Sequence, residues 1–290
     1  MNYRHAYHAG NFADVLKHVV LALVIEHLKQ KDAAFRVVDT HAGPGMYDLS
    51  DARAQRTGEW LGGIGRLIGP AAPPVPPAME KVLQPYLSAV RAFNEPGLLT
   101  RYPGSPRIAR ALMRPQDTLV ANELHKEDAA DLRRLLGRDP QSKVLELDGW
   151  TALKALLPPK ERRGLILVDP PFEEPGELKR LTAALLDAVK RFATGVYVLW
   201  YPIKDRSALR SFNRQLSESG IGRLLQIELE IGSPDGSDQG ADRLVGAGLV
   251  VPNPPFRLDT ELQRILPWLG ERLAMDRKPR WNVVWLDGEK

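Results

Sequence analysis

Short apolar segments alternate with amphipathic segments along the first 200 residues of this 290-residue chain. The apolar segments have the length of buried strands, and the amphipathic segments 126–136 and 176–191 have helical periodicity. Strands that alternate with helices indicate βαβ units, and therefore a mostly parallel sheet covered by helices. A further helix is predicted at 13–30, and the five predicted strands are 35–39, 118–122, 143–147, 165–168 and 194–199.

The interval between the first two predicted strands is too long for a single crossover helix. It contains helical segments at 60–68 and 79–93, with a cluster of prolines between them. We therefore predict a small helical subdomain at 50–100, inserted into one α/β domain that consists of 1–49 and 101–290.

The pattern changes after residue 199, where two apolar runs follow without a helix between them. These runs are 224–231 and 244–252, and the link between them, Gly232–Arg243, is rich in Gly, Asp and Ser. This arrangement is typical of an antiparallel hairpin with a mobile loop. The complete prediction is an α/β fold with a mostly parallel seven-stranded sheet and an antiparallel C-terminal hairpin.

Composition excludes several kinds of chemistry. The chain has no cysteine, which rules out disulfides, cysteine-bound zinc, iron–sulfur clusters and thiol nucleophiles. No apolar run reaches the about 18 residues of a membrane span, and the N-terminus lacks an apolar signal core, so we expect a cytoplasmic protein. The net charge of +4, from 40 basic and 36 acidic residues, is too small to indicate a nucleic-acid partner by itself.

The segment Gly164–Phe172 carries the strongest functional signal, because an apolar strand ends there in Asp169, two prolines and an aromatic residue. Ligands of open α/β sheets bind at the carboxyl ends of the strands. Pro170 and Pro171 lack N–H donors and offer stiff carbonyl acceptors. An acceptor carboxylate, such a carbonyl and the ring of Phe172 suit an exocyclic amine on a planar base. The structural alternative is a strand that prolines terminate before a core Phe.

Other strand ends outline a pocket for an adenosyl group. The loop Thr40–Gly45 contains two glycines that allow a ligand to approach the backbone closely, although it is neither a dinucleotide fingerprint nor a Walker A loop. Glu123 is placed to hold a ribose diol, and Asp148 with Gly149 could accept from an adenine amine. For each acid alone, a capping or solvated role is an equal alternative.

The histidines and basic residues near the N-terminus favour contacts with phosphate or base over metal binding. His5 and His8 follow Arg4 closely, and no carboxylate stands at metal-ligand spacing from them. Because cysteine is also absent, we expect no metal. The small basic groups elsewhere fit solvated helix faces, and any that border the site would position RNA through its phosphates.

The combination resembles the class I S-adenosylmethionine-dependent methyltransferases that methylate amino groups. Further segments resemble one family, the bacterial 23S rRNA adenine-N6 methyltransferases called RlmJ (YhiR). These segments are Tyr3–His18, Asp39–Gly45, Tyr102–Pro106, Arg162–Pro171 and Leu199–Pro202. The resemblance extends over nearly the whole chain and is weakest in 50–98 and after 253. It implies a Rossmann-like fold with a helical insertion.

The resemblance also implies roles for individual residues and S-adenosyl-L-methionine as the cofactor. The residues implied in cofactor contacts are His18, His41, Ser105, Glu123, Asp148, Gly149 and Asp169. Asp169 is implied as catalytic, supported by Tyr3, His5 and Lys17. The expected substrate contacts come from Arg4, His8, Pro170, Pro171 and Phe172. The family commonly has Tyr at the position of Phe172, so stacking is kept and any role of a hydroxyl is lost.

The implied activity is methylation of the exocyclic N6 of a specific adenine in 23S ribosomal RNA. Nothing in the sequence demands a dimer, so we expect a monomer. Three alternatives remain: a DNA adenine-N6 methyltransferase, a protein-glutamine methyltransferase and a non-catalytic nucleic-acid-binding protein in DNA uptake or use. Asp169 counts against the glutamine enzymes, which usually have Asn there. The segment 50–100 is small and helical for a DNA target-recognition domain. A pure binder needs neither the Asp169 motif nor the glycine loop.

Overall fold

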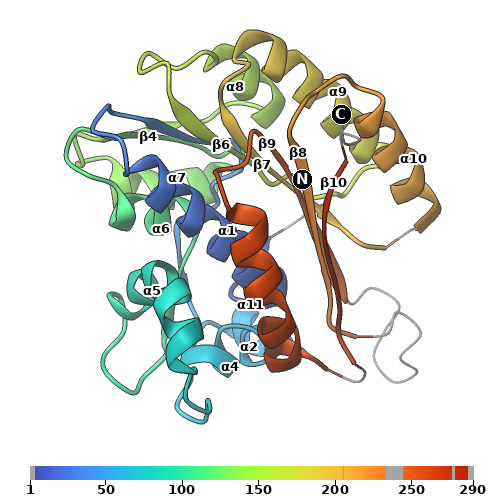
Figure 1. Cartoon of the computed structure of the whole chain (residues 1–290). Helices are drawn as coiled ribbons and strands as arrows, with labels where there is room; N and C mark the ends of the chain where they lie inside the picture. Colours follow the sequence, from blue (N-terminus) through green and yellow to red (C-terminus); the bar gives the residue numbers. More distant parts are fainter. Residues whose placement is uncertain (1–3, 205, 233–243, 276–277, 287–290) are drawn as a thin grey trace. The chain divides into compact units, whose positions relative to one another are not determined.

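The computed structural model describes residues 4–204, 206–232, 244–275 and 278–286 (Figure 1). The chain divides into two compact units, Met1–Val168 and Asp169–Lys290. Within the described residues, no helix has the length and apolar character needed to cross a membrane.

The first unit contains the predicted alternation of strands and helices. Its strands are β1 (Arg36–Asp39), β2 (Met46–Asp48), β3 (Arg101–Pro103), β4 (Thr118–Asn122), β5 (Ser142–Leu145) and β6 (Gly164–Val168). Its helices are the 3-10 turn η1 (His5–Tyr7) and α1 (Phe12–Leu28), α2 (Ala52–Thr57), α3 (Glu59–Gly62), α4 (Gly65–Ile68), α5 (Pro77–Arg91), α6 (Ser105–Leu112), α7 (Lys126–Leu136) and α8 (Gly149–Ala155).

Four strands of this unit form parallel pairs in the order β6-β1-β4-β5. The register aligns Asp39 with Ala121 in β4 and with Leu167 in β6, so the strands end at one common edge. Strand β5 ends two residues earlier than predicted. The side-chain amide of Asn122 donates to the carbonyl of Leu147 and accepts its N–H, at 2.9 and 3.0 Å, and so replaces the next pair of backbone bonds.

Helix α1 is the central helix of the first unit. It begins at Phe12, one residue before the predicted start, because the Asn11 side chain accepts the N–H of Asp14 and caps the first turn, and it ends two residues before the predicted end. The helix packs against α5, α6 and β6. It is therefore buried on nearly all sides, and its polar residues Asp14, Lys17 and His18 are buried with it.

The segment 50–100 is helical, as predicted, and contains α2 to α5. Its longest helix, α5, buries Leu83, Tyr86 and Leu87 and packs against α1 and α6. The small antiparallel pair β2-β3 joins the two ends of the segment, with Tyr47 opposite Tyr102. The insertion thus contributes side chains to the core of the first unit, and its status as a separate subdomain stays a prediction.

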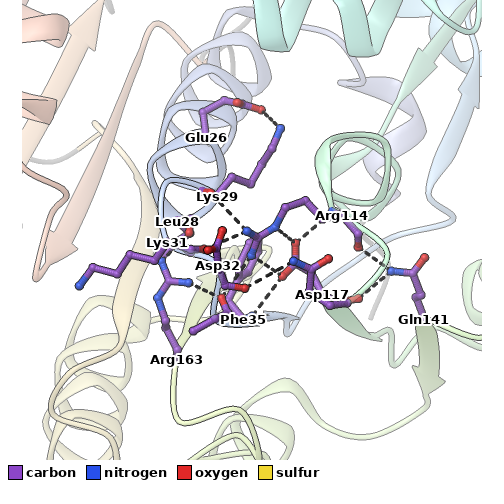
Figure 2. Close-up of polar contacts among 12 residues, drawn as sticks. Glu26, Leu28, Lys29, Lys31, Asp32, Phe35, Arg114, Asp117, Gln141 and Arg163 are labelled. Atoms are coloured by element: carbon purple, nitrogen blue, oxygen red, sulfur yellow. Dashed lines mark hydrogen bonds and ion pairs between the residues drawn. The ribbon is translucent and has the colours of Figure 1, made fainter.

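A polar cluster fixes the loop between α1 and β1 at the amino ends of the strands (Figure 2). Asp117 is fully buried and accepts the backbone N–H groups of Phe35 and Arg114, at 3.2 and 3.0 Å, and the Nε–H of Arg114 at 3.0 Å. Arg114 and Arg163 also donate to the carbonyls at the end of α1 and in this loop, those of Leu28, Lys29, Lys31 and Ala33. The cluster lies at the strand ends opposite those that carry the predicted site, so its role is structural.

The second unit contains α9 (Glu177–Arg191), β7 (Val196–Pro202), α10 (Arg206–Ser217), β8 (Leu224–Glu230), β9 (Gly246–Pro252), α11 (Leu258–Leu273) and β10 (Arg280–Trp285). Its strands pair in the order β10-β8-β9-β7, and all three pairings are antiparallel. The predicted hairpin is present as β8 and β9, while most of its predicted mobile loop, 233–243, lies outside the described residues. Strand β10 was not predicted, because only Val283 of this edge strand is buried and its apolar signal is weak.

Candidate active site

The carboxyl edge of the parallel strands in the first unit is held together by polar contacts. Thr40, directly after β1, donates from its backbone N–H and its hydroxyl to the carbonyl of Leu167, at 3.1 and 3.0 Å. The buried amide of Asn122 donates to the carbonyl of Thr40 at 3.0 Å, in addition to its bonds with Leu147. Because ligands of such sheets bind at this edge, it is the natural position for a cofactor site.

Glu123, a predicted cofactor residue, anchors the glycine loop that follows β1. Its Oε2 accepts the N–H of Gly43 and its Oε1 that of His125, both at 2.8 Å. Burial raises the pKa of Glu123, although both N–H groups oppose this shift. Gly43 has a φ of 60°, and a Cβ there would lie 2.5 Å from the hydroxyl of Tyr47, so the loop requires glycine at this position.

Asp39 is a candidate site residue that the sequence analysis missed. It ends β1, is 1% exposed, and accepts the hydroxyl of Ser105 at 2.7 Å and the backbone N–H of His41 at 3.3 Å. The carboxylate thereby connects two predicted cofactor residues. The signal was present in the sequence, because Asp39 ends an apolar strand just as Asp169 follows one.

The predicted cofactor residues His41, Asp148 and Gly149 lie near one another in the first unit. His41 has its Nδ1 2.8 Å from the hydroxyl oxygen of Thr40, and its ring contacts Trp150 edge to face, with centroids 5.8 Å apart. Asp148 caps α8 by accepting a backbone N–H at 2.9 Å, the structural role left open for it above. Gly149 leaves space for the imidazole, because a Cβ here would lie 2.5 Å from Cε1 of His41.

The N-terminal residues predicted to support catalysis gather around Asp14, which the sequence analysis also missed. The carboxylate is 1% exposed and accepts from Nζ of Lys17 at 2.8 Å and from the N–H of Gly10 at 2.9 Å. Nε2 of His5 lies 2.9 Å from Oδ2 of Asp14. Burial alone would raise the pKa of Asp14, but His5 and Lys17 outweigh it and hold the pKa well below its usual range. Tyr3 lies outside the described residues.

The signal for Asp14 was an acid inside an apolar helical stretch, with a lysine three residues later. Such a pair lies on one face of a helix, and burial of that face forces the two charges to neutralise each other. The predicted catalytic Lys17 is accordingly 4% exposed and held by this carboxylate.

His18, the predicted cofactor residue of α1, is buried together with Asp14. Its Nδ1 lies 2.7 Å from the hydroxyl oxygen of Tyr102, and burial lowers the pKa of His18 to about 3. The imidazole is therefore neutral at physiological pH. Its Nε2 is buried without a hydrogen-bond partner among the described residues.

The predicted substrate residues Arg4 and His8 are both engaged by carboxylates. Arg4 forms ion pairs with Glu127 and, at 3.2 Å, with Asp128 at the start of α7. Nδ1 of His8 lies 2.9 Å from a carboxylate oxygen of Glu59 in α3. Contacts of these side chains with RNA stay predictions. In the described ranges, no group of three or more His, Asp or Glu residues is arranged to hold a metal ion.

The second unit begins with the predicted catalytic segment. Asp169 is half-buried and follows Val168, the last residue of β6, in the chain. Phe172 is half-buried and has a φ of 52°, an uncommon conformation for a bulky residue and one that marks a constrained turn. Its ring contacts that of Trp200 in β7 edge to face, with centroids 5.6 Å apart. Pro170 is buried, and Pro171 is half-buried.

Comparisons with known proteins agree with the resemblance found in the sequence. The family model RsmJ, described as "Ribosomal RNA large subunit methyltransferase D, RlmJ", matches residues 32–287. A protein of Escherichia coli (strain K12) called "Ribosomal RNA large subunit methyltransferase J" is 43% identical over 286 residues, which cover 99% of both chains. A protein of the same name from Haemophilus influenzae is 40% identical and covers both chains completely.

A crystal structure of a Legionella pneumophila protein shares the fold, with a TM-score of 0.81 and 31% identity over 96% of this chain and 98% of the other. The predicted fold class and the predicted family are thus confirmed. The roles of individual site residues stay predictions. This chain is a member of the RlmJ family of ribosomal RNA large subunit methyltransferases.

Proposed function

We propose that this protein transfers a methyl group from S-adenosyl-L-methionine to the exocyclic N6 of a specific adenine in 23S ribosomal RNA. The observation that carries the proposal is the match, over 99–100% of the chain, with two relatives named as ribosomal RNA large subunit methyltransferases. The Asp169–Phe172 segment supports the choice of an amine as the methyl acceptor. We expect the protein to act in the cytoplasm as a monomer.

The polar groups at the carboxyl edge of the first unit fit the proposed cofactor. The Glu123 carboxylate accepts two backbone N–H groups and keeps acceptor capacity for a ribose diol. Gly149 lacks a side chain next to His41, which suits a flat adenine ring. The remaining residues proposed to hold the cofactor are His18, Ser105, Asp148 and Asp169, together with Asp39 through its bond to Ser105.

When bound, S-adenosyl-L-methionine supplies an electrophilic methyl group on its sulfonium. The residues of the second unit would prepare the acceptor. The lone pair of an adenine amine is delocalised into the ring, so the amine is a poor nucleophile. Hydrogen bonds from N6–H to the Asp169 carboxylate and the Pro170 carbonyl would favour a pyramidal nitrogen, and Asp169 would take the proton that is lost. Most of the rate gain would come from orientation and preorganised electrostatics.

Substrate binding would use the aromatic and basic residues. The ring of Phe172, constrained by Trp200, would stack on the target base, which must leave any helix and therefore lies in a loop, bulge or flipped nucleotide. Arg4 and His8 would contact the RNA, and Tyr3 would cover the pocket. The proposed support from Lys17 and His5 is indirect, because both are held by Asp14 and keep that charged cluster rigid.

Methyl transfer assays test this proposal. Purified protein is incubated with cofactor labelled in the methyl group and with protein-free 23S rRNA, ribosomal particles, DNA or a glutamine peptide, and digested RNA is analysed for N6-methyladenosine. We expect label in 23S rRNA only, at a single adenine. Label in DNA or peptide would favour the alternatives considered above, and cofactor binding without any transfer would favour a binding protein.

A matched pair of variants tests the role of Asp169. Asp169→Ala is expected to reduce transfer at least 100-fold while the protein folds and still binds the cofactor. Glu174→Gln, which changes a nearby exposed acid, serves as the control and is expected to keep the normal rate. An Asp169→Ala protein that methylates normally would refute the mechanism.

A further inference from the structure

A chain of three buried polar side chains connects helix α1 with the inserted segment. Nδ1 of His18 lies 2.7 Å from the hydroxyl oxygen of Tyr102 in β3, and that oxygen lies 3.2 Å from the hydroxyl oxygen of Tyr86 in α5. The exposed fractions of the three residues are 1%, 0% and 1%. The proposed mechanism gives neither tyrosine a role.

The hydrogen bonds of this chain have a preferred direction. If Nδ1 of His18 donated to Tyr102, Tyr102 would donate to Tyr86, and the buried O–H of Tyr86 would have no acceptor among the described contacts. In the opposite direction, Tyr86 donates to Tyr102, and Tyr102 donates to Nδ1 of His18. Each O–H then has an acceptor, and Nε2 of His18 is the one group of this chain without a partner among the described residues. The first direction leaves two such groups, the O–H of Tyr86 and Nε2, and is disfavoured because unpaired buried polar groups are costly.

The preferred direction places the proton of His18 on Nε2. Burial lowers the pKa of His18 to about 3, so the ring carries only one proton at neutral pH and the tautomer decides which nitrogen donates. Nε2 is buried and has no partner among the described residues. A buried N–H donor without a partner in the free protein indicates a ligand with an acceptor atom.

The segment after β3 connects this chain with the predicted cofactor pocket. Gly104 stands two residues after Tyr102, and its N–H donates to the carbonyl of Gly45 in the glycine loop at 3.0 Å. Ser105, the next residue, donates to Asp39. The same short segment thus holds both His18 and the end of β1, which puts the hydroxyl chain beside the residues proposed to bind the cofactor.

We propose that Tyr102 and Tyr86 are positioning residues that hold His18 in the Nε2–H tautomer, so that this N–H donates to an oxygen acceptor of the bound cofactor. The inference rests on the proposed use of S-adenosyl-L-methionine. It gives helix α5 a role in the site, since Tyr86 lies in this helix and completes the chain.

Nitrogen-15 NMR of histidine-labelled protein reads the tautomer without any activity measurement. In the unaltered protein, we expect Nδ1 of His18 to have the shift of an unprotonated nitrogen and Nε2 that of a protonated one. Tyr102→Phe removes the donor to Nδ1 and is expected to move His18 toward the other tautomer, with a smaller change in Tyr86→Phe. A proton on Nδ1 in the unaltered protein would overturn the proposal.

Calorimetry with S-adenosyl-L-methionine supplies the second measurement. We expect the Kd to rise about tenfold in Tyr102→Phe and to stay unchanged in Tyr197→Phe. The latter removes a buried hydroxyl that donates to the carbonyls of Ala188 and Phe192 in the second unit. His18→Gln, whose amide nitrogen can replace Nε2, is expected to bind within threefold, while His18→Asn, whose amide replaces Nδ1, loses at least tenfold.

The possible results separate this inference from the proposed function. Normal cofactor binding by both Tyr102→Phe and His18→Asn would overturn the inference alone. Failure of the unaltered protein to bind the cofactor would overturn the proposed function and this inference with it.

Discussion

The contact between Gly149 and His41 provides a sharp test of the cofactor site. An alanine Cβ at position 149 would lie 2.5 Å from Cε1 of His41, closer than such atoms come in real proteins, so the ring must move. The ring then loses its hydrogen bond with Thr40 and its edge contact with Trp150. A neutral hydrogen bond contributes about 0.5–1.5 kcal/mol and an aromatic pair a similar amount.

These values set the expected size of the effects. Gly149→Ala loses about 1–3 kcal/mol from the displaced ring, partly offset by a gain in helix propensity of up to about 1 kcal/mol. The melting temperature should therefore fall by only a few degrees. Cofactor binding should suffer more clearly. If His41 makes one hydrogen bond to the cofactor, the Kd measured by calorimetry should rise about tenfold.

Gly62→Ala is the matched control, because Gly62 also lies in a short helix and a Cβ there meets nothing within 4 Å. It should bind the cofactor as the unaltered protein does. The reasoning is refuted if Gly149→Ala binds S-adenosyl-L-methionine within twofold of normal, since the ring contact would then be irrelevant to the site.

Three further predictions concern stability, pH and the aromatic pair. Asp117→Ala should lower the free energy of unfolding, measured in urea, by about 2–4 kcal/mol. The substitution removes the buried acceptor of Arg114, and hydrogen bonds to charged groups contribute about 1.5–3 kcal/mol each. A loss below about 1 kcal/mol would contradict this reasoning. Burial lowers the pKa of His18 to about 3, so the unfolded chain takes up a proton below pH of about 6.5 that the folded protein cannot hold. Stability should therefore be complete above that pH and fall toward pH 3, with a shallower fall in His18→Gln; equal slopes would disprove the assignment. Trp200→Leu removes the ring against which Phe172 packs. It should lower kcat up to about tenfold and leave the Kd of the cofactor unchanged. A normal kcat would show that the contact with Trp200 does not position the ring of Phe172.

The sequence predicted the strands well because their signal is local. Runs such as 119–121 and 165–168 are apolar throughout, as is typical of strands buried on both faces, and they lie in β4 and β6. Strand β10 escaped prediction for the opposite reason. It lies at an edge with one buried residue, and its pairing with β8 supplies the stabilisation that its own side chains do not.

Most predicted site residues were found from sequence motifs, whereas some residues that contact them in the structure were not. Glu123 and Asp148 follow strands, so their position at the carboxyl edge could be expected from the chain order alone. Tyr102 could not be found in this way. Its importance comes from a contact over a long distance in the sequence, the one with His18, which no local pattern records.

By itself, the sequence determined the α/β class, the helical character of residues 50–100 and the family. These follow from local periodicity and from motifs in which neighbouring residues act together. The tertiary structure decided which polar side chains form ion pairs and hydrogen bonds with one another. Only folding buries Asp14 against Lys17 and aligns Tyr86, Tyr102 and His18, because the energies of ion pairs and hydrogen bonds depend on burial and distance rather than on order in the chain.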